Sequence, residues 1–214
     1  KTQDRVDLLI PIVKAWFTDL GNEIASTGVQ VHGGMGFIEE TGAAQHLRDA
    51  RIAPIYEGTN GIQANDLVGR KLLRDGGAAA QELIAEMRAL DPALAEAPGE
   101  DIEAIRRPLT PGIDALAIAT EWMVETGKSD PPRALAGAVP YLKLMGAVTG
   151  GWLMARGALA ARQRLAERDG DVRFHEAKLI TARFFAEHVL ATAPSLLPAV
   201  AGGNTVMSFD LDRF

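Results

Sequence analysis

No cysteine occurs among the 214 residues, so disulfides, thiol nucleophiles and zinc sites built on cysteine are excluded. Histidines number only four, and no two of them stand at the spacing of a metal-binding helix motif. The adjacent carboxylates Glu39 and Glu40 point apart on a predicted loop, where we expect them to be solvated. The sequence therefore predicts no metal centre.

Basic and aromatic residues are also scarce. Lys and Arg number 22 against 28 Asp and Glu, and the net charge of -6 argues against a nucleic-acid partner, which needs a basic surface. Aromatic residues make up only 6% of the chain, whereas hydrophobic residues in total make up 47%. A core of small and aliphatic side chains favours closely packed helices, and we predict an all-α helical bundle.

No signal peptide opens the sequence, and we expect no hydrophobic run long enough to cross a bilayer. Its most apolar run, Leu144–Ala155, has 12 residues without a charge, and a membrane span needs roughly 18. The chain starts at Lys1 without an initiator methionine, and its first residues already have the pattern of a helix interior. We expect part of a longer cytoplasmic protein with no membrane span.

Apolar residues recur at three- and four-residue steps along the chain, which is typical of amphipathic helices. Gly28 is a plausible stop for the first helix, and Gly76–Gly77 is the expected boundary between a domain of residues 1–76 and a domain of residues 77–214. Helices are expected over residues 6–26, 41–53, 60–75, 78–90, 110–127, 130–167 with a bend at Pro140, and 172–193, with a separate helical turn over residues 102–107.

Three glycines follow the first predicted helix, in the segment QVHGGMGF that begins at Gln30. Glycines let a backbone approach a ligand closely and can point successive N–H groups at an anion. A dinucleotide-binding motif is excluded, because no strand precedes the segment and the glycine spacing is wrong. Two interpretations stay open at this point: an anion-binding loop, or a simple turn between helices.

A single carboxylate, Glu57, lies on the short connection between two predicted helices, just before the helix-starting residues Thr59 and Asn60. The positive end of the following helix favours the ionised carboxylate. Burial beside Ile55 and Tyr56 would favour the protonated form. The sequence leaves both effects open, but the position suits a general base better than a solvated surface charge.

The segment from Gln30 to Gln63, QVHGGMGFIEETGAAQHLRDARIAPIYEGTNGIQ, resembles the signature region of flavin-dependent acyl-CoA dehydrogenases. The patterns Q-x-x-G-G-x-G, R-D-A-R-I and I-Y-E-G-T-N-x-I-Q match at every fixed position. The resemblance covers about residues 1–75. Residues 77–214 are similar to the extra helical C-terminal domain of the branch that includes 3-methylmercaptopropionyl-CoA dehydrogenases. The resemblance implies dehydrogenation of an acyl-CoA thioester to a trans-2-enoyl-CoA, with FAD as cofactor.

The resemblance also implies roles for the residues around Glu57. Glu57 matches the family's catalytic base, which removes the proton α to the thioester carbonyl while the β-hydrogen leaves as hydride to the flavin. Gly58 matches the residue whose backbone lies beside the substrate. Thr59 and Gly61 match positions that contact the flavin. Many members carry Glu or Gln at the second position, so Gly61 removes a side chain from that contact.

Gln30, Gly33 and Gly34 match the family loop that holds the adenosine-diphosphate part of FAD, in a flavin bound mainly by the neighbouring subunit. The resemblance further implies a homodimer or homotetramer and electron-transferring flavoprotein as electron acceptor. Upstream domains of the family hold the isoalloxazine ring and most of the CoA. We therefore expect the isolated chain to be inactive and to bind FAD poorly.

A second hypothesis is a non-catalytic helical assembly or interaction domain that retains the dehydrogenase signature. Glu57 separates the two hypotheses, because degenerate relatives often replace the base and this chain keeps it. For residues 77–214 we expect a structural or oligomer-stabilising role.

Overall fold

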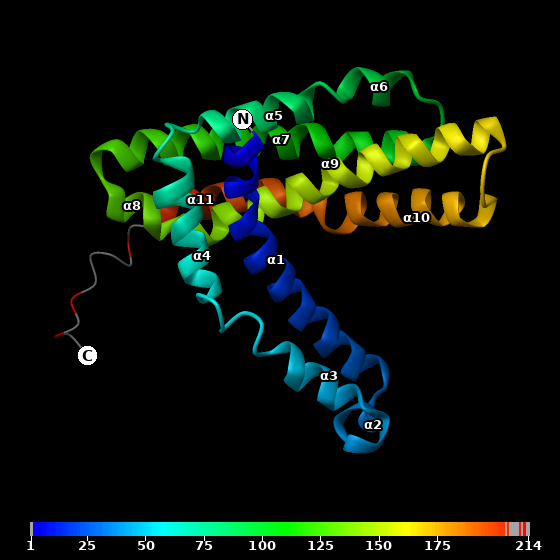
Figure 1. The fold of residues 1–214 in the computed structure, drawn as a ribbon, viewed down its shortest axis with the longest axis horizontal. Helices are drawn as coiled ribbons and strands as arrows, with labels where there is room; N and C mark the ends of the chain where they lie inside the picture. Colours follow the sequence, from blue (N-terminus) through cyan, green and yellow to red (C-terminus); the bar gives the residue numbers. More distant parts are fainter. Residues whose placement is uncertain (1, 204, 206–209, 211, 213–214) are drawn as a thin grey trace.

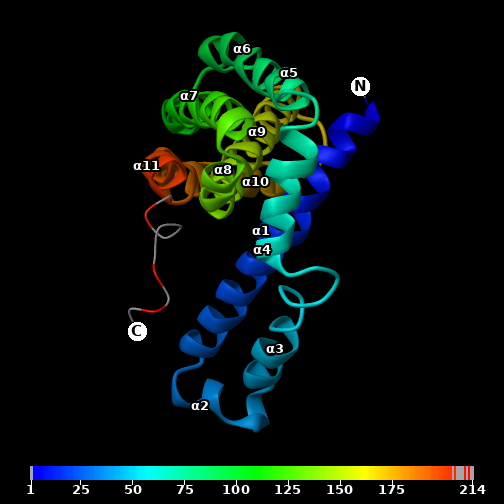
Figure 2. The same ribbon diagram turned by 90° about the vertical axis from the view of Figure 1, so that its left-hand side faces the viewer.

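The computed structural model describes residues 2–203, 205, 210 and 212. These residues form helices joined by turns, with no β-strand among them, so the all-α prediction is confirmed. Figures 1 and 2 show a helical bundle at one end and a hairpin of two antiparallel helices that projects from it. The elements are α1 (Thr2–Val31), α2 (Gly34–Phe37), η1 (Glu39–Thr41), α3 (Ala43–Ala50), α4 (Asn60–Asp66), η2 (Leu67–Leu72), α5 (Ala78–Arg88), α6 (Asp91–Glu96), α7 (Glu100–Ser129), α8 (Pro131–Ala136), α9 (Ala138–Glu167), α10 (Val172–His188), η3 (Leu190–Leu196) and α11 (Leu197–Gly202).

The projecting hairpin consists of α1 and α3, with the short helix α2 at its tip (Figure 2). The first half of α1 and the helices α4 and η2 join the bundle, whose central helices α7, α9 and α10 pack against one another. A single apolar cluster runs through both parts of the chain, because Leu8, Ile12 and Trp16 of α1 belong to the same core as residues of α7 and α9. The hairpin is therefore supported at its base by the bundle.

Trp16 fixes α1 against α9. A Cβ atom at Gly146 of α9 would lie 2.7 Å from the Trp16 ring, and one at Gly150 would lie 3.1 Å from it. These glycines form a slot that only a helix without side chains at those positions can offer. On the other side of the slot, Phe185 of α10 meets Trp16 edge-on, with ring centroids 6.4 Å apart.

Several predicted helix boundaries are wrong at prolines. Pro108 and Pro111 lie inside the single helix α7, although a break was expected before residue 110. Residues on both sides of these prolines are buried, and tertiary packing offsets the cost of the missing hydrogen bonds. The bend expected at Pro140 is wrong, because the helix is interrupted at Gly137, between α8 and α9. Only glycine fits there, since a Cβ would lie 2.2 Å from the Val200 carbonyl oxygen. Pro140 then falls in the first turn of α9, which tolerates proline.

Helix boundaries in the hairpin also differ from the prediction. Helix α1 continues past Gly28 to Val31, and α3 ends at Ala50, before Pro54. Glu39 and Glu40 are both exposed, as expected. Arg48 also donates two hydrogen bonds of 2.8 Å to the Glu39 carboxylate and holds the pKa of Glu39 below its ordinary value.

One described stretch, Val172–Gly202, is long and apolar enough to cross a membrane by length and composition alone. It is not one regular helix, because α10 ends at His188 and the 3₁₀ segment η3 follows. Leu190, Ala193 and Val200 of this stretch belong to the core cluster. Core helices pass the same test of length and composition, so the finding is weak evidence for a membrane span.

The Trp16 slot predicts opposite effects for two substitutions in α9. Gly146→Ala would press a methyl group into the Trp16 ring, and we expect it to lower the free energy of unfolding by about 1–3 kcal/mol. Gly157→Ala is the matched control, because a Cβ there meets no atom within 4 Å and alanine favours the helix by about 0.5–1 kcal/mol. Chemical denaturation measures both. Equal changes in the free energy of unfolding for the two substitutions would contradict the claim that Trp16 packs in a slot that requires glycine at position 146.

Candidate functional site

The connection between α3 and α4 contains an unusual backbone conformation. Glu57 has a φ angle of 55° and Gly58 a φ angle of 81°, so two consecutive residues are left-handed. Glycine adopts this conformation freely, but a residue with a Cβ pays about 1–2 kcal/mol for it. Such conformations persist only where the surroundings hold them, and they cluster at functional sites.

Glu57 and Gly58 form a turn, which we call the Glu57 turn. Hydrogen bonds hold the carbonyl groups of both residues. The carbonyl oxygen of Gly58 accepts from Lys14 Nζ at 2.7 Å, and that of Glu57 accepts from Gln63 Nε2 at 3.2 Å. Of the two expected helix-starting residues, Thr59 is the N-cap of α4, and its hydroxyl accepts from the Ile62 backbone N–H at 3.4 Å. The turn is thus fastened to α1 on one side and to α4 on the other.

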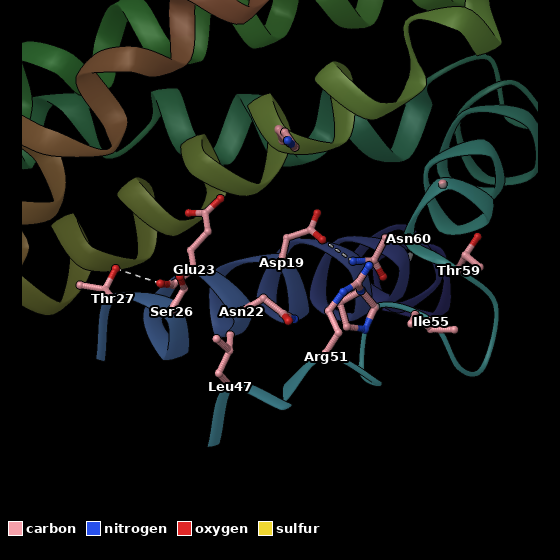
Figure 3. Close-up of a pocket in the computed structure, with 13 residues that line it drawn as sticks. Asp19, Asn22, Glu23, Ser26, Thr27, Leu47, Arg51, Ile55, Thr59 and Asn60 are labelled. Atoms are coloured by element: carbon pink, nitrogen blue, oxygen red, sulfur yellow. Dashed lines mark hydrogen bonds between the residues drawn. The ribbon is translucent and has the colours of Figure 1, made fainter. Parts of the chain in front are cut away.

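Asn60 connects the start of α4 to α1. Its side-chain amide donates to Asp19 Oδ1 at 2.7 Å, drawn as a dashed line in Figure 3, and to the Ala15 carbonyl at 3.0 Å. Its amide oxygen accepts from Lys14 Nζ at 2.9 Å. Because Asn60 is half-buried, leaving these groups unpaired would cost about 1–3 kcal/mol. The network therefore fixes where α4 begins.

The side chain of Glu57 is exposed in this chain. Its apolar neighbours Ile55 and Tyr56 are 48% and 53% exposed, so they do not bury the carboxylate. Within the described part of the chain, the backbone N–H groups of Glu57, Gly58 and Thr59 have no hydrogen-bond acceptor. Three N–H donors and one carboxylate are consequently available on the same open turn.

A cleft of about 1010 Å³ lies beside the turn, between α1, the α3–α4 connection and Lys143 of α9 (Figure 3). Among the predicted site residues, Thr59 and Gly61 line it. A Cβ at Gly61 would meet no atom within 4 Å, so this position leaves open space beside the cleft. The side-chain oxygen of Asn22, also in the wall, is buried without a partner among the described residues.

The other predicted group, Gln30, Gly33 and Gly34, lies at the tip of the hairpin, remote from the bundle (Figure 2). Gly33 has a φ angle of 60° and donates its N–H to the Gln30 carbonyl at 3.0 Å. Gly36 is required by the fold, because a Cβ there would lie 2.2 Å from the Val29 carbonyl oxygen. A Cβ at Gly33 or Gly34 would meet no atom within 4 Å. Both glycines therefore leave their outer side open to a group from outside this chain.

The predicted site residues thus form two groups. Glu57, Gly58, Thr59 and Gly61 lie together at one turn, whereas the glycine loop lies at the far end of the hairpin (Figure 1). Lys14 escapes prediction because it is a lone lysine in an otherwise apolar helical stripe, and nothing in its spacing points to a contact 44 residues away.

Comparison with known families defines the class of protein. Residues 1–73 match the model described as "Acyl-CoA dehydrogenase, C-terminal domain", and residues 77–210 match the model described as "Acetyl-CoA dehydrogenase C-terminal like". The chain belongs to the acyl-CoA dehydrogenase family. Proteins of this family are oxidoreductases that in general depend on FAD and act on acyl-CoA. The two matches meet beside Gly76–Gly77, and the division into two domains there stays a prediction.

Individual relatives agree with the family assignment. The chain is 48% identical to 3-methylmercaptopropionyl-CoA dehydrogenase of Ruegeria pomeroyi over 190 residues, which is 89% of this chain and 32% of the relative. It is 29% identical to the broad-specificity linear acyl-CoA dehydrogenase FadE5 of Mycobacterium tuberculosis over 97% of this chain and 35% of the relative. It is also 29% identical to a butyryl-CoA dehydrogenase of Syntrophomonas wolfei over 94% of this chain and 33% of the relative. The chain thus spans about a third of the length of these relatives.

The left-handed conformation of Glu57 predicts a gain in stability when its Cβ is removed. Glu57→Gly relieves about 1–2 kcal/mol of strain, partly offset by the greater freedom of glycine in the unfolded chain. We expect a net gain of about 0.5–1 kcal/mol in the free energy of unfolding. Glu57→Gln keeps the Cβ and serves as control, with a change within about 0.5 kcal/mol. If denaturation curves show Glu57→Gly to be no more stable than Glu57→Gln, the backbone of Glu57 is not strained.

Proposed function

We propose that this chain is the C-terminal part of a FAD-dependent acyl-CoA dehydrogenase in which Glu57 removes the α-proton of an acyl-CoA thioester, giving a trans-2-enoyl-CoA. The observation that carries the proposal is the Glu57 turn. A carboxylate is kept in a strained left-handed conformation, although glycine would fit without strain, and both carbonyls of the turn are anchored. Strain that the structure retains at a charged residue is typical of a functional group.

The turn offers two things that proton abstraction from a thioester needs. The α-proton is weakly acidic, so the reaction requires a positioned base and stabilisation of the charge that develops on the carbonyl oxygen. Glu57 supplies the carboxylate, and the N–H groups of Glu57, Gly58 and Thr59 are free to donate to that oxygen. The backbone of Gly58 lies beside the acyl group in this arrangement. Bound FAD supplies the hydride acceptor for the β-hydrogen.

The two groups of glycines fit a cofactor that approaches from outside the chain. We assign Gln30, Gly33 and Gly34 to the adenosine-diphosphate part of a FAD held by a neighbouring subunit, and Thr59 and Gly61 to a FAD beside Glu57. The support is the open space at Gly33, Gly34 and Gly61, where no atom of this chain would meet a Cβ. At Gly61 the contact reduces to the backbone.

The apolar outer face of α1 supports a larger assembly around this chain. Large hydrophobic side chains recur along it at helical spacing and are about half exposed or more: Val6, Ile10, Val13, Phe17, Ile24 and Val31. We propose that upstream domains or a second subunit cover this face and the Glu57 turn, in a homodimer or homotetramer. The isolated chain is then inactive and binds FAD poorly. A cytoplasmic location and electron-transferring flavoprotein as acceptor complete the proposal.

Residues 77–214 take a structural role in this proposal. Their helix α9 carries the Gly146 and Gly150 slot for Trp16, and Lys143 forms one side of the cleft beside the turn. The helices of residues 77–214 thereby support α1, which holds the Glu57 turn through Lys14.

Substitution of the proposed base should stop the reaction without removing the cofactor. In the full-length flavoprotein, we expect Glu57→Gln to slow flavin bleaching by acyl-CoA by roughly 10²–10⁴-fold, with FAD still bound. Glu40→Gln, which removes the same charge from another exposed site, should bleach normally. Stopped-flow absorbance over a panel of acyl-CoAs measures both. Bleaching of Glu57→Gln at the wild-type rate would show that Glu57 is not the base.

The glycine loop can be tested at Gly34, where the chain itself does not need glycine. We expect Gly34→Ala to leave the free energy of unfolding of this chain unchanged within about 0.5 kcal/mol. In the full-length protein it should weaken FAD binding roughly tenfold, the effect of about 1.4 kcal/mol, because the methyl group occupies the side from which FAD approaches. Titration of the apoprotein with FAD measures the dissociation constant, and an unchanged value would exclude Gly34 from the FAD site.

A further inference from the structure

The ammonium group of Lys14 lies in contact with the Glu57 turn. The residue lies in the middle of α1 and is half-buried, and its ammonium group donates to the Gly58 carbonyl oxygen at 2.7 Å and to Asn60 Oδ1 at 2.9 Å. In the described part of the chain it forms no ion pair with a carboxylate. Both of its hydrogen bonds therefore go to the segment that follows Glu57.

The Asn60 amide is oriented by this contact. Its oxygen faces the Lys14 ammonium, and its nitrogen faces the Asp19 carboxylate at 2.7 Å. The reversed amide would place an NH₂ group against a cation and an oxygen against an anion, so the orientation follows from charge. Lys14 and Asp19 of α1 thus clamp Asn60 from two sides and fix the first residue of α4.

The Lys14 contact also controls the peptide group that follows Glu57. Gly58 lacks a Cβ, so rotation about its backbone bonds meets little steric resistance. A charged donor holds its carbonyl at 2.7 Å, whereas the neutral Gln63 amide holds the Glu57 carbonyl at 3.2 Å. Charge-assisted hydrogen bonds are about twice as strong as neutral ones. Lys14 is therefore the stronger of the two anchors of the left-handed turn.

We propose that Lys14 is a positioning residue for the dehydrogenation: through the Gly58 carbonyl and Asn60 it holds the Glu57 carboxylate at the place where it meets the α-proton. This inference rests on the proposed function of Glu57. It assigns Lys14 no contact with substrate or flavin. Its effect belongs to the proton-abstraction step, because a base displaced by about 1 Å can lose on the order of 10²-fold in rate.

The test uses three variants of the full-length flavoprotein. Lys14→Met keeps most of the unbranched side chain but removes the charge and the donors, whereas Lys14→Arg keeps the charge and the donors. Lys178→Met removes the same charge from an exposed residue of α10 that does not line the cleft and has no hydrogen bond to the turn. Stopped-flow absorbance gives the rate of flavin reduction at saturating acyl-CoA and the apparent dissociation constant of acyl-CoA.

We expect flavin reduction in Lys14→Met to slow by roughly 10- to 100-fold, with acyl-CoA affinity and FAD content close to those of the wild type. Lys14→Arg should recover most of the rate, and Lys178→Met should match the wild type. A Lys14→Met protein that reduces flavin at the wild-type rate, or that loses rate only in proportion to lost FAD, would overturn the inference. If the Lys14→Met protein does not accumulate, the rate of flavin reduction in Lys14→Arg decides. A Lys14→Arg rate as low as that of Glu57→Gln would count against the inference.

Failure of the inference and failure of the proposed function give different results. If no acyl-CoA bleaches the wild-type protein, or if Glu57→Gln bleaches normally, the proposed function fails. If the wild type bleaches, Glu57→Gln does not, and Lys14→Met behaves like Lys178→Met, then Glu57 is the base and only the role of Lys14 is wrong.

Discussion

The connection between α3 and α4 is constrained at one residue, because Glu57 has a left-handed backbone with a φ angle of 55°. That conformation is unfavourable for a residue with a Cβ, and it persists because the segments on both sides of it are held. Lys14 and Gln63 hold the carbonyls of the turn, and Asn60 holds the start of α4 against α1. The strain of one residue is thus balanced by hydrogen bonds from two helices.

Helix α1 can hold the turn only because it is itself fixed. The glycine slot of α9 receives Trp16, two residues after Lys14 and three residues before Asp19. The core is continuous from α1 to the helices of residues 77–214, so these helices support the part of α1 that holds the turn. Such a division, with rigid helices carrying a strained loop, is how proteins commonly hold reactive groups.

Much of this could be predicted from local sequence, and the remainder could not for physical reasons. Apolar periodicity predicts the helices, and the Thr59 cap follows from its hydroxyl and its place before α4. The course of α7 through Pro108 depends on packing from distant helices, which no local pattern reports. The contact of Lys14 with Gly58 joins residues 44 positions apart and becomes visible only when α1 and α4 lie together.

The central claim is that α1 holds the Glu57 turn in its left-handed conformation before any substrate binds. The most direct measurement is a crystal structure of the full-length flavoprotein at atomic resolution, without substrate and with a bound acyl-CoA. The account predicts that in both states Glu57 keeps a positive φ angle and Lys14 Nζ stays within hydrogen-bond distance of the Gly58 carbonyl oxygen. A Glu57 backbone in the extended region, with Lys14 turned away from the turn, would contradict it.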